Sequence, residues 1–377
     1  MAIDLLTLRD QIDEIDKEMV ALYEKRMDIC KDVAQFKIET GKKVFDKVRE
    51  EEKIQKVRSL ATGDFNKCAV EELFQQIMSI SRKMQYQLLE KAGVTNGKLS
   101  FMEAEEIVSD KAKVVFQGAE GAYSYAAMNE YFGEEVDSFH VDSFRDAMDA
   151  LEEGRADFAV LPIENSTAGI VSEIYDLMTE YENYIVGEQI IKIEHCLMAV
   201  PGAKIEDVER VYSHPQSLMQ SSNYLNKKNW QQIGMQNNAF AAKYVKDSAQ
   251  YNQAAIASEA AAKIYGLEIL EKGVNNLKGN STRFIIVTNQ KVFRSDAGKI
   301  SICFELNHQS GSLYHMLSHF IYNGLNMTKI ESRPLEDRNW EYRFFIDFEG
   351  NLKDGAVKNA LRGIREEARN LKILGNY

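Results

Sequence analysis

The sequence has only four cysteines and four prolines among its 377 residues. Cys30, Cys68, Cys196 and Cys303 are scattered without a Cys-x-x-Cys pair. This spacing excludes a disulfide framework and the common zinc-binding patterns, so we expect free thiols in a reducing compartment. The scarcity of proline, the lack of any low-complexity tract and a hydrophobic fraction of 45% predict a globular chain throughout.

Positive charge and long apolar runs are also scarce. The chain has 46 lysines and arginines against 58 acidic residues, a net charge of -12, which argues against nucleic acid or an acidic membrane surface as a partner. No apolar run approaches the roughly 20 residues that span a bilayer. The first ten residues carry acids where a signal peptide is basic and then apolar. We therefore expect a cytoplasmic protein of two or three domains.

The first ninety residues have a helical pattern. Apolar residues recur at alternating spacings of four and three from Leu8 to Phe36, which predicts one long helix with a coiled-coil-like seam. Arg26 occupies one seam position and needs a carboxylate from the protein or from a ligand. Arg9 and Lys37 flank the seam about 42 Å apart, at about 1.5 Å per residue. If all three cations bind one small dianion, Arg9 must come from an antiparallel second copy, which predicts an obligate helical dimer.

Two more helices are predicted after Gly41, the later one from about Ala69 to Ala92, and polar residues recur on them at one-turn spacing. In order and spacing, the first 92 residues resemble the all-helical chorismate mutases at Leu8-Arg9, Lys25-Arg26, Lys37, Asp46-x-x-Arg49-Glu50 and Ser81-x-x-x-Gln85. The resemblance implies a pericyclic rearrangement of chorismate to prephenate without a covalent intermediate.

The resemblance also implies a role for each polar residue. Arg26 and the partner subunit's Arg9 would clamp the substrate carboxylates. Lys37 and Gln85 would face the ether oxygen, and Arg49 would support the carboxylate end. Asp46, Glu50 and Ser81 would line the remainder, with Glu50 suited to accept a hydrogen bond from the ring hydroxyl. The alternative of an inactive domain kept only for dimerisation is disfavoured by Arg26 in the seam.

Residues 93–111 are polar and glycine-bearing, which predicts a linker with room for a short helix. Within 157–171, an apolar run predicts a buried strand, Pro162 ends it, and Gly169 leads from a polar turn into a helix. Open α/β sheets place anionic ligands at such helix N-termini. The repeated order of helix, strand and polar turn predicts two similar α/β lobes with a ligand in the cleft. This lobe order also fits periplasmic-type solute-binding proteins, so a ligand sensor is an alternative.

Four motifs of this central region resemble prephenate dehydratases: the glycine-bearing loop at 117–124, Pro-Ile-Glu-Asn-Ser-Thr-Ala-Gly at 162–169, Ser-His-Pro-Gln at 213–216 and Thr-Arg-Phe at 282–284. The resemblance implies loss of hydroxyl and carbon dioxide from prephenate, with Thr282 as proton donor. A dehydratase of the aminated substrate arogenate is the nearest alternative.

The same resemblance implies the other dehydratase residues. Glu164, Asn165 and Ser166 would assist Thr282, because an unperturbed hydroxyl is a poor acid. Tyr123 and Ser124 would line the substrate site. His214 would either orient a substrate group or serve as a core or capping histidine. Arg283 is a candidate for a substrate carboxylate, although a strand residue next to Thr282 should point the other way.

The last eighty residues alternate in the order βαββαβ, which predicts a ferredoxin-like α+β sandwich. Two segments resemble the amino-acid-binding motifs of ACT regulatory domains, Gly311-Ser312-Leu313-Tyr314 and the segment with Glu331, Ser332 and Arg333. Ser312 and Tyr314 depart from the usual alanine and valine. The resemblance implies that phenylalanine binds at a dimer interface and inhibits the dehydratase, a coupling between two sites.

The sequence therefore predicts a multidomain enzyme without cofactor or metal. His315 and His319 have the spacing of two metal ligands but lack a third. The predicted parts are an all-α mutase domain at 1–92, a linker at 93–111, a two-lobed α/β dehydratase domain at 112–290 and an ACT domain at 299–377. We expect a homo-oligomer, either a dimer or a tetramer.

Overall fold

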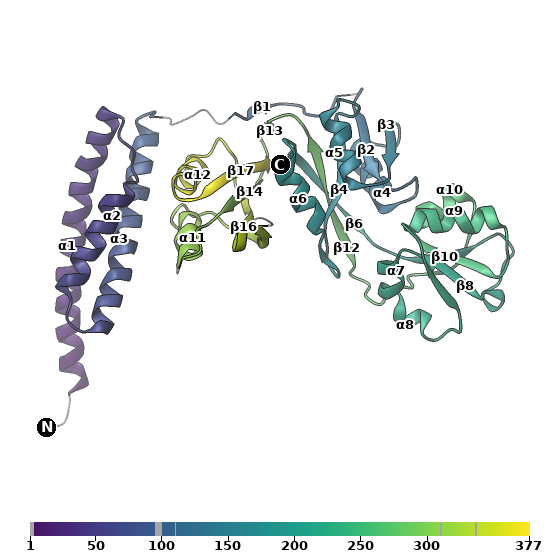
Figure 1. The fold of residues 1–377 in the computed structure, drawn as a ribbon, viewed down its shortest axis with the longest axis horizontal. Coiled ribbons are helices and arrows are strands. Elements are labelled where there is room, and N and C mark those ends of the chain that lie inside the picture. The colour runs from purple at the N-terminus through teal and green to yellow at the C-terminus, as the bar shows by residue number, and fades with distance from the viewer. Residues whose placement is uncertain (1–3, 95–99, 110, 310, 336–337) are drawn as a thin grey trace. The chain divides into compact units, whose positions relative to one another are not determined.

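The computed structural model describes residues 4–94, 100–109, 111–309, 311–335 and 338–377 (Figure 1). The chain divides into two compact units. Unit 1 contains residues 1–100 and 302–372, and unit 2 contains residues 101–301 and 373–377. No helix in the described ranges is long and apolar enough to cross a membrane.

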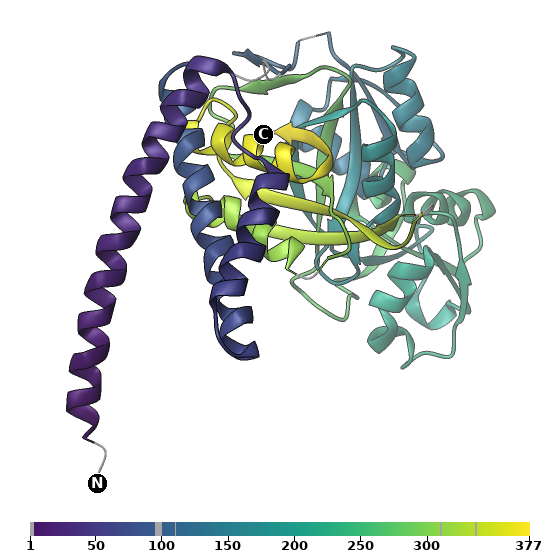
Figure 2. The same ribbon diagram turned by 60° about the vertical axis from the view of Figure 1, so that its left-hand side comes forward.

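The N-terminal part of unit 1 is a helical domain of α1 (Leu5–Thr40), α2 (Lys47–Leu60) and α3 (Asp64–Lys91). The predicted long helix is confirmed: Asp4 caps its N-terminus, and Gly41 ends it at φ +69°, in the left-handed region. Both ribbon views show the N-terminal part of α1 projecting beyond α2 and α3 (Figures 1 and 2). Its apolar seam is therefore largely uncovered in a single chain, with Ile12 57% and Leu22 67% exposed.

The C-terminal part of unit 1, here called the C-terminal module, has the predicted order βαββαβ. Its elements are β14 (Lys299–Glu305), α11 (Ser312–Tyr322), β15 (Met327–Leu335), β16 (Arg338–Glu349), α12 (Gly355–Glu367) and β17 (Arg369–Asn376). The strand order β15-β16-β14-β17 is that of a ferredoxin-like sheet. Phe304, Phe320 and Phe348 fill its core. The last residues of β17 belong to unit 2, where Gly375 pairs with Ile185 of the same unit.

Unit 2 consists of two α/β lobes. The first contains β2 (Lys113–Gln117), α4 (Tyr123–Phe132), β3 (Asp137–Val141), α5 (Phe144–Glu152), β4 (Phe158–Asn165), β5 (Gly169–Ile170), α6 (Ser172–Glu180), β6 (Tyr184–Lys192) and β12 (Ser281–Thr288). The second contains β7 (Cys196–Ala199), the short helix η1 (Ile205–Asp207), β8 (Arg210–Ser213), α7 (Pro215–Gln220), α8 (Ser222–Leu225), β9 (Gln231–Gly234), α9 (Asn238–Ser248), β10 (Gln253–Ala257), α10 (Glu259–Tyr265) and β11 (Glu268–Lys272).

The two lobes share one spatial arrangement of strands, although the chain reaches the fourth strand last in the first lobe (β12) and first in the second (β7). Within the first, the strand order is β3-β2-β4-β12-β6, and in the second it is β9-β8-β10-β7-β11. In the spatial order of each sheet, the first three strands are parallel to one another. The fourth strand pairs antiparallel with both the third and the fifth. The prediction of two similar lobes is therefore confirmed.

Three local predictions for unit 2 were wrong. Strand β4 continues through Pro162 to Asn165, because pairing with β2 ends at Val160 and the pairing with β12 shifts register beside the proline. Gly169 and Ile170 form the two-residue strand β5, so helix α6 begins only at Ser172. The described part of the linker forms a strand, β1 (Met102–Ala104), instead of the short helix. This strand pairs with β13 (Val292–Arg294).

Candidate active sites

The helical domain contains a cavity of about 220 Å³ between its three helices. Seven of the residues predicted for a mutase site line it: Arg26, Lys37, Asp46, Arg49, Glu50, Ser81 and Gln85. Arg9 is exposed on α1 and is not among the lining residues. Its contribution from a second copy therefore stays a prediction.

Arg26 enters this cavity from α1. Its Nη1 donates a hydrogen bond to Ser81 Oγ at 2.7 Å, and Ser81 Oγ donates to the carbonyl of Ile77 at 2.8 Å. Among the described ion pairs, none gives Arg26 a carboxylate partner within the chain. The counter-charge that a half-buried guanidinium requires is therefore left to a ligand or to another chain.

Lys37 lies in the last turn of α1. Its Nζ donates to Gln85 Oε1 at 2.9 Å and to the carbonyl of Val44 at 2.8 Å. An ammonium group has three hydrogens, so one more can point to a ligand. Burial lowers the pKa of Lys37, and the carboxylates of Glu50 and Asp46 oppose this shift. Lys37 is thus a fixed, partly desolvated donor beside Gln85.

Asp46, Arg49 and Glu50 come from the start of α2. Asp46 precedes the helix instead of lying on it, and its carboxylate caps the N-terminus by accepting from the backbone N–H of Arg49 at 3.1 Å. The cap fixes how the helix begins, and with it the position of Arg49 and Glu50 in the first turn. The predicted spacing thus serves local structure and the cavity together.

Unit 2 has a cavity of about 290 Å³ lined by residues of both lobes. Five of the residues predicted for the dehydratase line it: Tyr123, Ser124, Asn165, His214 and Thr282. Tyr123 and Ser124 open helix α4, and Ser124 Oγ donates to the carbonyl of Gln117 at 2.6 Å, which closes the glycine-bearing loop onto the end of β2.

Asn165 holds the hydroxyl of Thr282. Its Oδ1 accepts from the backbone N–H groups of Thr167 and Ala168 at 3.0 and 2.9 Å, so its amide nitrogen must face the other way. That nitrogen donates to Thr282 Oγ1 at 2.9 Å. Because the Thr282 oxygen accepts this bond, its own hydrogen is available to a molecule in the cavity. The arrangement suits a hydroxyl that donates a proton.

Three other predicted residues lie outside this cavity lining. Arg283 follows Thr282 in strand β12 and points to the opposite face, where its guanidinium lies 3.3 Å from Glu188 and 3.6 Å from Glu164. Ser166 Oγ accepts from the backbone N–H of Ser281 at 2.9 Å. The structure therefore does not bring Arg283, Glu164 and Ser166 to Thr282's face of the sheet.

His214 has the capping role that was one of its two predicted alternatives. It is the N-cap of α7, and its Nδ1 accepts from the backbone N–H of Gln216 at 3.2 Å. It also lines the cavity, and burial lowers its pKa. A neutral imidazole is needed for Nδ1 to accept this bond, so the cap and the lowered pKa agree.

The sequence did not single out His195 or Gln220, which both line the cavity. His195 Nδ1 lies 2.9 Å from Tyr123 Oη, and its Nε2 lies 3.1 Å from Gln220 Oε1. Asn280 Nδ2 also donates to Gln220 Oε1 at 3.1 Å, which marks that atom as an acceptor. In the neutral imidazole the proton is therefore on Nε2, and Nδ1 accepts from Tyr123. Burial lowers the pKa of His195 and raises that of Tyr123.

The described lining of the dehydratase cavity has no lysine or arginine. Instead, helices α4 and α9 begin there, at Tyr123 and at Asn238. The N-terminus of a helix attracts anions through its free N–H groups and its dipole. Asn237 adds a buried Nδ2 without a hydrogen-bond partner among the described residues. These groups can bind a carboxylate without a cationic side chain.

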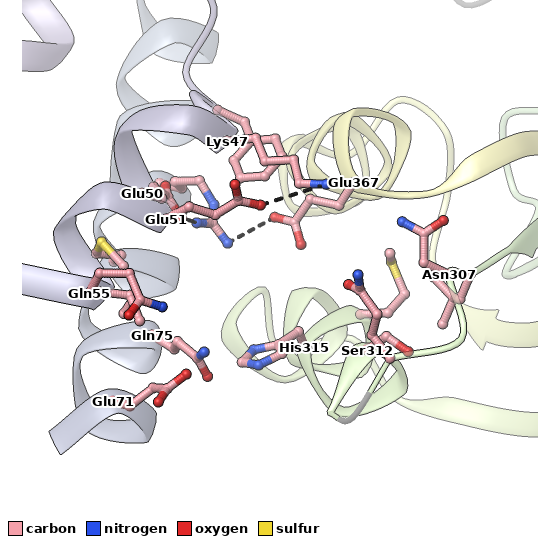
Figure 3. Close-up of a pocket in the computed structure, with 17 residues that line it drawn as sticks. Lys47, Glu50, Glu51, Gln55, Glu71, Gln75, Asn307, Ser312, His315 and Glu367 are labelled. Atoms are coloured by element: carbon pink, nitrogen blue, oxygen red, sulfur yellow. Dashed lines mark hydrogen bonds and ion pairs between the residues drawn. The ribbon is translucent and has the colours of Figure 1, made fainter. Parts of the chain in front are cut away.

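The residues of the two predicted effector motifs lie on different elements of the C-terminal module. Gly311, at φ +77°, precedes α11, and Ser312 and Leu313 form its first turn. Glu331, Ser332 and Arg333 lie in β15. Ser312 lines a cavity of about 360 Å³ within unit 1 (Figure 3). His315 lines the same cavity, and no group of three metal-ligating side chains occurs in the part of the chain that the structure describes.

A cation-rich pocket in a helical bundle, and a separate polar cleft between two α/β lobes, define an enzyme with two small-molecule sites. The profile of chorismate mutase type II matches residues 8–86, and that of prephenate dehydratase matches residues 114–292. A bifunctional chorismate mutase/prephenate dehydratase of Enterobacter agglomerans is 32% identical over 381 residues, covering 99% of this chain and 95% of that protein. The protein of the same name from Escherichia coli (strain K12) is 30% identical over 381 residues, covering 99% and 96%.

Among solved structures, a prephenate dehydratase from Arthrobacter aurescens in complex with L-Phe has a TM-score of 0.65 and 28% identity. It covers 70% of this chain and 89% of that chain. The chain belongs to the family of bifunctional chorismate mutase/prephenate dehydratases. It has both activities, converting chorismate to prephenate and prephenate to phenylpyruvate in phenylalanine biosynthesis.

Proposed function

We propose that the cavity of the helical domain is the mutase site. The observation that supports this most strongly is the cavity's charge, with Arg26, Lys37 and Arg49 lining it beside Ser81 and Gln85. Arg26 would bind one carboxylate of chorismate, and Lys37 with Gln85 would face the ether oxygen, where negative charge develops as the bond breaks. Arg49 would support the carboxylate end, while Asp46 and Glu50 complete the wall. Holding chorismate in a folded, reactive conformation supplies the remaining rate acceleration.

This mutase site requires a homodimer. The exposed apolar residues of α1, such as Ile12 and Leu22, form a face that a second α1 would cover. An antiparallel partner would bring the partner subunit's Arg9 toward the end of the cavity that Arg26 leaves open. We also propose a cytoplasmic location, because all four cysteines are free.

The cleft of unit 2 would bind prephenate, with Thr282 donating a proton to the departing ring hydroxyl. Asn165 orients Thr282 through the 2.9 Å hydrogen bond. The helix N-termini at Tyr123 and Asn238 would hold the carboxylates. Loss of water and carbon dioxide creates an aromatic ring, so the substrate supplies the driving force and the site supplies position and one acid.

The C-terminal module would be an ACT domain that binds phenylalanine and inhibits the dehydratase. Its ferredoxin-like strand order and its two motifs, with Ser312 and with Arg333, support this proposal. The related Arthrobacter aurescens structure in complex with L-Phe also supports it. Phenylalanine at a distant site would inhibit the dehydratase only if it binds the less active state of the protein more tightly than the active state. This coupling is reciprocal, so prephenate would weaken the binding of phenylalanine by the same factor.

One experiment tests these assignments together. Purified protein receives chorismate without any cofactor, and prephenate and phenylpyruvate are followed with and without phenylalanine. We expect phenylpyruvate to form and phenylalanine to suppress it. Phenylpyruvate formation that phenylalanine leaves unchanged would contradict the ACT assignment. Accumulation of prephenate alone would contradict the assignment of the unit 2 cleft, and adding arogenate would then distinguish an arogenate enzyme from a sensor.

A further inference from the structure

Arg82 is a buried charge in α3 that the proposed mutase mechanism does not use. It directly follows Ser81, lines the mutase cavity and is 7% exposed. Its Nη1 donates to Oε2 of Glu50 in α2, and its Nη2 lies 3.0 Å from Oε1 of Glu367 in α12. Figure 3 labels both carboxylates beside the neighbouring cavity, Glu50 on the helical domain and Glu367 on the C-terminal module. One guanidinium thus connects a mutase residue to the C-terminal module.

The groups around Arg82 keep this connection charged. Burial lowers the pKa of Arg82, but the carboxylates of Glu367 and Glu50 outweigh burial and raise it. Burial likewise raises the pKa of Glu367, but His319, Arg82 and Lys83 outweigh it and hold the pKa below its ordinary value. His319 Nε2 lies 3.1 Å from Glu367 Oε1. The pair is therefore an ionised, water-poor contact.

The geometry leaves part of Glu50 available. In the described contacts Arg82 reaches only Oε2 of Glu50, through one of its two terminal nitrogens. A guanidinium and a carboxylate favour a bidentate pair with two parallel hydrogen bonds. Glu367 prevents this by engaging the second nitrogen, so Oε1 of Glu50 can accept from a substrate.

We propose that Arg82 is a positioning residue of the mutase, and that Glu367 of the C-terminal module holds it so that one carboxylate oxygen of Glu50 stays free for the substrate hydroxyl. This inference rests on the proposed role of Glu50. It makes the mutase site dependent on a residue 317 positions further along the chain. The C-terminal module would then belong to the mutase site as well as to regulation.

The test uses the full-length protein with Arg82→Ala, Arg82→Lys and Glu367→Gln. Glu366→Gln is the matched control for Glu367, because Glu366 also contacts the helical domain, accepting from Tyr86 Oη at 2.5 Å and from the Phe45 N–H at 3.2 Å. Arg58→Gln is the matched control for Arg82, since Arg58 joins α2 to α3 by pairing with Glu71 and does not line the mutase cavity.

We expect Arg82→Ala and Glu367→Gln each to lower mutase kcat about tenfold, the size of one lost charge-assisted hydrogen bond. KM should change less, because the substrate carboxylates bind elsewhere in the cavity. Arg82→Lys should recover part of the rate. The double variant Arg82→Ala/Glu367→Gln should lose no more than Arg82→Ala alone, since both act through one contact. In a Glu50→Ala background, Arg82→Ala should have no further effect.

Dehydratase activity assayed with prephenate, and the thermal unfolding temperature, are measured for every variant. Equal losses of mutase activity in Glu366→Gln and Glu367→Gln would overturn the proposal in favour of general docking. Full mutase activity in Arg82→Ala would overturn it as well. A wild-type protein without mutase activity would instead refute the proposed function of the helical domain, so the two failures are distinguishable.

Discussion

Replacing Thr282 with valine isolates the proposed proton donor of the dehydratase. Valine has nearly the shape of threonine and lacks only the hydroxyl. Asn165 Nδ2 would lose its acceptor on Thr282 but would keep Asn280 Oδ1 at 2.8 Å and the Ser281 carbonyl at 3.1 Å. Because no buried amide is left without a partner, we expect the free energy of unfolding to change by less than about 1 kcal/mol.

The effect on the reaction should be much larger. A positioned general acid contributes roughly 10²- to 10⁴-fold, which equals about 3 to 5 kcal/mol of activation free energy. We therefore expect Thr282→Val to lower dehydratase kcat by at least about a hundredfold. KM should stay close to the wild-type value, since the proposed carboxylate-binding groups at Tyr123 and Asn238 are untouched.

The assay follows phenylpyruvate from prephenate, with Thr282→Ser as the matched control. Serine keeps a hydroxyl within reach of Asn165, so it should retain activity within about tenfold, a loss that allows for looser positioning. Mutase activity of both variants, measured with chorismate, should equal the wild-type value because that site lies in unit 1. A Thr282→Val enzyme with more than a third of the wild-type kcat would refute Thr282 as the acid.

Three other predictions concern unit 2. Ser143→Ala removes the capping box of α5 and should lower the free energy of unfolding by about 1 kcal/mol, measured by urea denaturation. Burial lowers the pKa of His195, so the unfolded chain binds a proton more readily than the folded one below the ordinary value of about 6.5. Stability should therefore be complete above about pH 6.5 and fall as the pH drops below it; in thermal melts from pH 7.5 to 5, His195→Asn should fall less steeply than wild type. Gly375→Ala places a Cβ 2.1 Å from the carbonyl oxygen of Ile185 and should cost about 1 to 3 kcal/mol, whereas Gly298→Ala, with open space around it, should not.

Much of the fold could be predicted because its signals are local or repeated. The seam of α1 and its end at Gly41 follow from periodicity and one glycine. The two lobes follow from the recurrence of helix, strand and turn. The prediction at Pro162 was wrong because a proline, which lacks an N–H, interrupts a strand only where both edges of that strand are paired. Strand β4 has lost its β2 neighbour by that point, and no local signal reports which edges of a strand are paired.

The cleft was predictable only in part. Asn165, His214 and Thr282 belong to recognisable motifs. His195 is a single histidine ahead of an apolar strand, and its neighbour Tyr123 comes 72 residues earlier. The spacing of Gln216 and Gln220, one helical turn apart on α7, was the one local signal available for Gln220. Contacts of this kind depend on how the two lobes pack together. The sequence near each residue does not indicate that packing.

Arg283 shows how elementary geometry limits a motif. It stands beside Thr282 in β12, and neighbouring strand residues face opposite sides, so only one of the two can reach the cleft. Thr282 is that residue, so in the proposed dehydratase site the carboxylates of prephenate would be bound by uncharged donors and helix N-termini. In the helical domain, by contrast, the cavity lining has the cations Arg26, Lys37 and Arg49. In the proposed function the two sites would therefore bind the same dicarboxylate by different means, with charged side chains where it is formed and with helix N-termini where it is consumed. This difference is consistent with prephenate being the product of one site and the substrate of the other.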